Sequence, residues 1–116
     1  MAKGRNPDFM NGVPELLILR LLKDREMYGY DLATAIREAT GGEISLGEGV
    51  IYPTLHDLER QNLVGSSHRK VGGRTRIYYR LTGKGEKRLA DQTSRWARLV
   101  QAVATCIKGE SGHAAT

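Results

Sequence analysis

Basic side chains gather in one part of this chain, and their chemistry is the first clue to its function. The whole chain has 18 Lys and Arg against 13 Asp and Glu, a net charge of +5. No acidic residue occurs between Arg60 and Gly85, which hold seven bases: Arg60, Arg69, Lys70, Arg74, Arg76, Arg80 and Lys84. A patch of one sign attracts polyanions, and nucleic acid is the commonest polyanion inside a cell. Composition alone is also compatible with an ordinary basic surface.

Residues that could perform catalysis or bind a metal lack the necessary spacing. The chain has no G-x-S-x-G elbow, Walker loop or complete G-x-G-x-x-G motif, and Gly47-Glu48-Gly49 lacks the third glycine. His68 and His113 have no metal-ligand spacing around them, and Cys106 is the only cysteine. We therefore expect neither an enzyme nor a metal site, cofactor or intrachain disulfide.

Length and hydropathy set the class of protein. A chain of 116 residues with 40% hydrophobic and 27% charged residues suits one globular domain. Its longest apolar run, Leu16 to Leu19, is far shorter than the ~20 residues of a membrane span. The first residues lack the apolar segment of a secretory signal, and one cysteine suits a reducing compartment. We expect a cytoplasmic protein without a membrane segment.

The hydrophobic pattern predicts two helices in the first third of the chain. Asn11 is suited to cap the first, which ends near Lys23. This helix is apolar almost all round, so we expect it at the centre of the domain. Apolar residues then recur at intervals of three and four from Tyr28 to Ala39, which predicts an amphipathic helix that Gly41-Gly42 ends.

A third helix is predicted after these glycines. Ser45-Leu46-Gly47-Glu48 has the form of a capping box, and a buried stripe follows at Ile51, Leu55 and Leu58. If Ser45 caps the helix, Pro53 lies beyond the first turn, which is the turn where proline is tolerated. Proline has no N–H, so the helix lacks the backbone hydrogen bond from position 53 to the carbonyl of Gly49. Either the helix begins near Gly49 or it is kinked, and we expect a kink or a broken first turn. Asn62 suits the left-handed residue that closes a helix.

A hairpin and a long helix complete the pattern. Residues 63–71 and 75–82 read as strands around a Gly72-Gly73-Arg74 turn, and Tyr79 belongs to the core-facing side of the second. Thr82 then caps a helix of about 24 residues. One side of that helix is apolar: Leu89, Trp96, Leu99, Val100, Val103 and Ile107.

Three helices, a hairpin and a long helix follow the order of a winged helix-turn-helix. The predicted fold class is mainly α with a small β-hairpin wing, plus a long C-terminal dimerisation helix. We divide the chain into a flexible basic arm carrying Lys3 and Arg5 (1–10), a DNA-binding domain (11–82), a dimerisation helix (83–108) and a disordered tail (109–116). In this arrangement the third helix enters the major groove and the wing reaches phosphates or the minor groove.

At this point the chain resembles the PadR-like family of transcriptional regulators over roughly residues 11–107. The resemblance is carried by the segments Leu16–Leu19, Tyr28–Leu32, Gly49–Glu59, Asn62–Val64 and Gly72–Thr82, with Gly85. The Tyr52-Pro53 pair, followed by a glycine-arginine wing and a double tyrosine, is its most specific part. Asn62 stands where the family usually has glycine, and asparagine tolerates the same backbone conformation.

The resemblance implies a dimeric cytoplasmic repressor of the short type, with one C-terminal helix that makes the dimer. It implies binding to a palindrome in double-stranded DNA, often of the ATGT and ACAT type, and release by a small molecule or a stress signal. A winged helix that serves as a protein-interaction or architectural module without effector response is the alternative.

Nine residues are the candidates for DNA contact: Gly49, Tyr52, Pro53, Thr54, His56, Arg69, Lys70, Arg74 and Arg76. For Tyr52 a phosphate contact competes with the role of a half-buried aromatic. Thr54 and His56 contact DNA or are simply exposed, and any one wing arginine could be an ordinary surface residue. Glu48 either completes the capping box or accepts from a cytosine amino group.

The last helix carries the candidate dimer interface. The apolar side is too long for so small a domain to cover, so a second chain is the natural partner. We assign five of its residues to that interface: Leu89, Trp96, Leu99, Val103 and Ile107. Trp96 is either a plain interface anchor or, paired with its twin, the wall of a pocket for a flat apolar or cationic effector.

Overall fold

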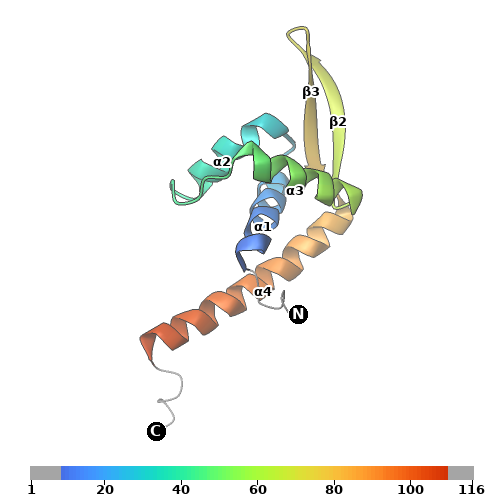
Figure 1. Ribbon diagram of the computed structural model, residues 1–116. Coiled ribbons are helices and arrows are strands. Elements are labelled where there is room, and N and C mark those ends of the chain that lie inside the picture. Colours follow the sequence, from blue (N-terminus) through green and yellow to red (C-terminus); the bar gives the residue numbers. More distant parts are fainter. Residues whose placement is uncertain (1–8, 110–116) are drawn as a thin grey trace.

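The computed structural model describes residues 9–109, so most of the predicted arm and tail lie outside the described residues. The elements in chain order are α1 (Phe9–Asp24), β1 (Met27–Tyr28), the 3-10 helix η1 (Gly29–Asp31), α2 (Leu32–Ala39), α3 (Glu48–Arg60), β2 (Val64–Val71), β3 (Arg74–Leu81) and α4 (Gly83–Lys108). This order confirms a mainly helical winged helix-turn-helix with a long last helix (Figure 1).

Helix α1 runs through the middle of the molecule, as its nearly uniform apolar surface predicts (Figure 1). It packs against α2, α3, α4 and β3, and Ile18 and Leu19 are fully buried. The helix begins at Phe9, so the prediction that Asn11 caps it is wrong. Pro14 removes only one backbone hydrogen bond, so a helical turn can still precede it.

The second predicted helix begins later than expected. Tyr28 lies in β1 and pairs with Tyr78 of β3, so the sheet of the described residues has three strands in the order β1-β3-β2. Gly29 follows in η1, where an added Cβ would lie 3.1 Å from the ring of Tyr79. This close approach leaves little room for a side chain at position 29. The predicted end of α2 is confirmed by positive φ angles at Gly41 and Gly42.

Helix α3 begins at Glu48 with Gly47 as its N-cap and without a side-chain cap. The capping box that begins at Ser45 is therefore wrong, and of the two alternatives the structure has the later start near Gly49. The Gly47 carbonyl itself accepts from Val50 and Ile51 at 3.0 Å, so backbone groups close the first turn. Asn62 ends the helix with a φ of 64°, as predicted.

The wing is a regular antiparallel hairpin that projects beyond the helices (Figure 1). Val71 pairs with Arg74 across a two-residue turn. Gly72 and Gly73 in that turn have φ angles of 57° and 79°, which is the geometry that favours glycine in short hairpins. The predicted strands and turn are confirmed to within one or two residues.

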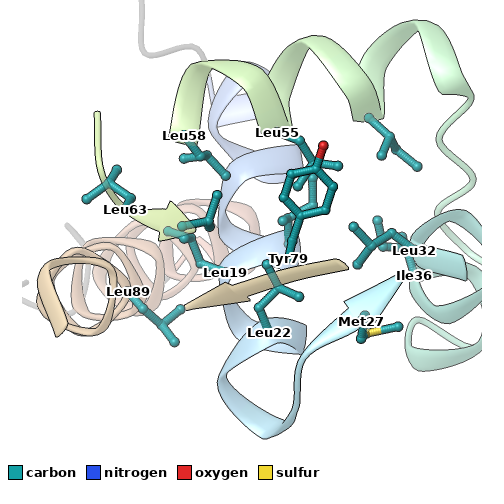
Figure 2. Packing of buried hydrophobic residues seen from close by; sticks show 13 residues of the cluster. Leu19, Leu22, Met27, Leu32, Ile36, Leu55, Leu58, Leu63, Tyr79 and Leu89 are labelled. Atoms are coloured by element: carbon teal, nitrogen blue, oxygen red, sulfur yellow. The ribbon is translucent and has the colours of Figure 1, made fainter. Parts of the chain in front are cut away.

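Figure 2 shows the core between α1, α3, the sheet and the first turns of α4. Tyr79 is buried there, as its position in the strand pattern predicts. The fully buried side chains of the described residues are Ile18, Leu19, Leu32, Ile36, Ile51, Leu55, Leu58, Leu63 and Val64. This core joins the wing, the third helix and the last helix to one scaffold.

Helix α4 begins at the predicted cap, where the Gly85 N–H donates to Thr82 Oγ1 at 3.0 Å. Leu89 is buried in the core, and the helix then runs past the body (Figure 1). The molecule is consequently elongated, at 67 × 29 × 27 Å. None of the described helices has an apolar stretch that would cross a bilayer.

Candidate nucleic-acid interface

The outward face of α3 is built from residues opposite its buried stripe. At 100° per residue, Gly49, Pro53, His56 and Arg60 lie on the side away from Ile51, Leu55 and Leu58. All four are exposed. Arg60 is bound to Asp57 at 2.5 Å, so its charge is partly neutralised on the helix itself. The helix thus presents a glycine, a rigid proline ring and an imidazole in a row.

Tyr52 stands at the edge of this face with its ring half-buried. The ring packs against the core, and an added Cβ on Gly29 would lie 3.4 Å from it. Burial raises the pKa of the Tyr52 phenol, with smaller contributions from Glu48, Tyr28 and Tyr30. The hydroxyl therefore stays protonated and able to donate a hydrogen bond at neutral pH.

The other two candidates on α3 differ in their surroundings. Thr54 is half-buried, and its hydroxyl donates to the Val50 carbonyl at 2.7 Å. His56 is exposed, with its ring centroid 6.4 Å from that of Tyr52. A small pocket of about 170 Å³ adjoins the start of the helix, lined by Gly29, Tyr30, Ala33, Thr34, Glu48, Ile51 and Tyr52. The structure thus brings Glu48 and Tyr52 to one site beside α2.

The four predicted wing bases fall into two groups. Lys70 and Arg74 are exposed near the tip and make no hydrogen bond or ion pair with any described residue. Arg69 and Arg76 lie further down, where their guanidinium carbons sit 4.4 Å and 4.6 Å above tyrosine ring centroids. Two charges are therefore presented to solvent at the tip and two are held against the sheet.

Sequence reasoning missed the residues that hold the second pair. Arg69 stacks on Tyr78 and forms an ion pair with Glu26, and Arg76 stacks on Tyr28. The only signal for this cluster was the double tyrosine of the second strand. Strand β1 has only two residues, so no alternating pattern indicates that Glu26 and Tyr28 lie against the wing.

Along α4 the predicted interface residues fall into a buried one, near the start of the helix, and several exposed ones further along it. Leu89 is buried in the core of its own chain, so it is not available to a second chain and that assignment is wrong. Trp96 is 37% exposed, Val103 45% and Ile107 79%, and Val100, not assigned before, is 46% exposed. An apolar groove of about 270 Å³ runs along this half, lined by Trp96, Leu99, Val100, Val103, Ala104 and Ile107.

No group of three His, Cys, Asp or Glu residues that could hold a metal ion occurs within the described part of the chain. The arrangement offers instead an exposed face of α3, a basic hairpin beside it and an exposed apolar face on the outer half of α4.

Comparison with known proteins identifies the family of this chain. Residues 18–91 match the model of the transcriptional regulator PadR-like family. A transcriptional regulator of Mycobacterium tuberculosis is 32% identical over 108 residues, covering 93% of this chain and 94% of that protein.

Solved structures agree with the fold. A transcriptional regulator from Clostridium thermocellum has a TM-score of 0.78 at 25% identity, over 85% of this chain and 97% of that one. The Bacillus subtilis PadR protein, solved in complex with operator DNA, has a TM-score of 0.65 at 29% identity. That match covers 70% of this chain and 46% of the Bacillus chain.

Proposed function

This chain belongs to the PadR-like family of transcriptional regulators, and on that premise we propose that it is a cytoplasmic, dimeric repressor of a palindromic operator. It is a DNA-binding regulator of transcription and not an enzyme. One observation carries the proposal: an exposed α3 face stands beside a wing whose tip bases have no partner among the described residues. The complex of the Bacillus relative with operator DNA supports double-stranded DNA as the ligand.

On DNA, α3 enters the major groove with the face that carries Gly49, Pro53 and His56. Thr54 reaches the groove from the edge of that face. The Tyr52 phenol donates to a phosphate and fixes the position of the helix. Lys70 and Arg74 at the wing tip neutralise phosphates of the adjacent groove. Glycine at position 49 keeps the start of the helix free of a side chain where the backbone approaches DNA.

A second copy of the chain covers the outer half of α4. Trp96, Val103 and Ile107 leave apolar surface exposed on a helix that its own domain does not reach. Burial of such surface stabilises an assembly by about 25 cal/mol per Å². In the dimer, the two α3 helices lie about 34 Å apart, so that they meet successive major grooves.

Gel-shift assays with the protein's own promoter test the DNA-binding proposal, with a scrambled duplex as the control. We expect a shift of the promoter at concentrations that leave the scrambled duplex free. Equal affinity for both duplexes contradicts operator reading. No binding to either at ~50 mM salt supports an interaction module instead.

The paired grooves of the proposed dimer suggest where an effector binds. Trp96 lines a wholly apolar groove on α4, and a second copy places another indole near it. Two indoles suit a planar apolar or cationic molecule, which they hold by stacking and cation–π contact. We assign the release of operator DNA to this pocket.

Fluorescence tests the effector site because Trp96 is the only tryptophan. We expect planar cationic dyes to quench its emission and to loosen operator binding in the same concentration range. A Trp96→Ala variant that remains dimeric should lose dye binding, as measured by dye fluorescence. Unchanged Trp96 emission across a broad panel of planar ligands leaves Trp96 as an interface anchor only.

A further inference from the structure

Two arginines face each other directly on the outer side of the wing. Arg69 of β2 is paired in register with Arg76 of β3, so both side chains leave the same face of the sheet. Like charges at directly opposed positions of an antiparallel pair repel each other. Other side chains on this face must therefore offset the repulsion between the two guanidinium groups.

Three side chains provide the compensation. The ring of Tyr78 lies beneath Arg69 and the ring of Tyr28 beneath Arg76, at 4.4 Å and 4.6 Å from the guanidinium carbons. Glu26 accepts a hydrogen bond from Arg69 through Oε1, and its other oxygen lies 3.5 Å from Ser67 Oγ. Glu26 is therefore the anion that Arg69 binds when DNA is absent.

This face continues to the start of α3. The ring centroids of Tyr30, Tyr28 and Tyr78 follow one another at 5.8 Å and 5.7 Å. Tyr30 also lines the small pocket with Glu48 and Tyr52. The tyrosines thus connect the first turn of α3 to the wing without a break.

The geometry of DNA indicates which part of the duplex lies near these tyrosines and arginines. When α3 lies in the major groove and the wing reaches the adjacent minor groove, a phosphate backbone separates the two grooves. That backbone passes the first turn of α3, and the tyrosines lead from there to Arg69 and Arg76 on the outer side of the wing.

We propose that Glu26 occupies the place of a DNA phosphate on Arg69 and competes with the operator for that arginine. The inference rests on the DNA-binding function proposed above. When DNA docks, a phosphate oxygen replaces the Glu26 carboxylate, while the Tyr78 ring keeps the guanidinium in position. Glu26 thereby lowers the affinity for every DNA sequence.

The position of Glu26 allows such an exchange. The side chains of Glu26 and Arg69 are 31% and 49% exposed, so a phosphate can approach both. Exposed ion pairs contribute little to folding. Removal of the carboxylate should consequently leave the fold intact and change only what Arg69 binds.

Glu26→Gln tests the proposal, with Asp91→Asn as the matched control. Asp91 also pairs with an arginine, Arg95 at 3.5 Å, but on α4 away from the wing. Both substitutions remove one negative charge and release one arginine. Binding of the full-length protein to operator and random duplexes is measured by fluorescence anisotropy at several salt concentrations, and thermal melting checks the fold.

We expect Glu26→Gln to bind both duplexes about fivefold more tightly than Asp91→Asn at ~0.1 M salt, with an unchanged melting temperature. In an Arg69→Ala background the same substitution should change binding no more than Asp91→Asn does. Equal affinities of the two single variants overturn the proposal, as does a gain that persists without Arg69. Wild-type protein that binds no DNA at low salt refutes instead the proposed function.

Discussion

At the scale of single residues, one glycine decides how closely two parts of the chain approach each other. Gly85 lies in the first turn of α4, where an added Cβ would be 2.1 Å from the Leu63 carbonyl oxygen. That oxygen also accepts from Thr82, through both its N–H and its hydroxyl. A glycine at position 85 therefore allows α4 to start directly against Leu63, in the short connection between α3 and β2.

Substitution of this glycine should be costly because the obstructing atom belongs to the backbone. We expect Gly85→Ala to lower the free energy of unfolding by about 3 kcal/mol. Gly83→Ala is the matched control in the same turn, since nothing lies within 4 Å of its added Cβ. It should be neutral or stabilise by up to about 0.5 kcal/mol. Urea unfolding measures both, and equal midpoints contradict the close packing of α4 on Leu63.

At the scale of elements, the wing separates its free charges from its stacked ones. Lys70 and Arg74 flank a tip made of Gly72 and Gly73, which have open space around them. We propose that this basic tip contacts phosphates rather than bases. Its contribution to binding should therefore be electrostatic and independent of sequence.

Arg74→Ala measures that contribution. We expect weaker binding to operator and random DNA alike, with a salt slope about one unit shallower, because one phosphate contact is lost. Arg98→Ala is the control, since Arg98 is exposed on α4 and has no ion pair or hydrogen bond with a described residue. Anisotropy titrations across salt concentrations distinguish the two. A loss confined to the operator would mean that Arg74 contacts a base.

The long elements were predictable and the short ones were not. Helices α1, α3 and α4 and the β2–β3 hairpin each repeat their pattern over many residues, so periodicity alone locates them. Strand β1 has two residues, and its partner on β3 lies far along the chain, so no local pattern indicates it. The Ser45 capping box failed because backbone groups at Gly47 close the first turn of α3.

The candidate site was predictable to a similar extent. Lys70 and Arg74 are free at the wing tip, as a basic hairpin implies. Glu26 binds Arg69 and Tyr28 stacks with Arg76, and only the tertiary fold brings these two residues to the wing. Leu89 shares the helical face of Trp96, and sequence spacing does not show where the body of the protein ends along that face.

At the scale of the whole molecule, the outer half of α4 dominates the shape. Its apolar face continues from the buried Leu89 to Ile107, beyond the region that the rest of the chain covers. A monomer with such a surface should associate with a second copy through it. The half-site spacing on DNA then depends on this helix.

Val103→Asp tests the dimer, because it places a charge at the centre of the apolar face on the outer half of α4. We expect a folded monomer at ~10 µM in sedimentation velocity, and loss of operator binding. Gln101→Asp is the control, since position 101 lies on the opposite side of the helix and is exposed. This variant should remain dimeric and bind the operator. Wild-type protein that sediments as a monomer at the same concentration contradicts the dimer itself.

The short strand β1 also has a consequence for the order of folding. Tyr28 pairs with Tyr78, fifty positions further along the chain, whereas the β2–β3 hairpin closes over two residues. Loop-closure entropy favours the local hairpin, so we expect β1 to dock after the hairpin has formed. The same pairing should open before the rest of the sheet in native-state hydrogen exchange. Because Glu26 directly precedes β1, we expect the contacts of Glu26 with Arg69 and of Tyr28 with Arg76 to form late and to be lost early.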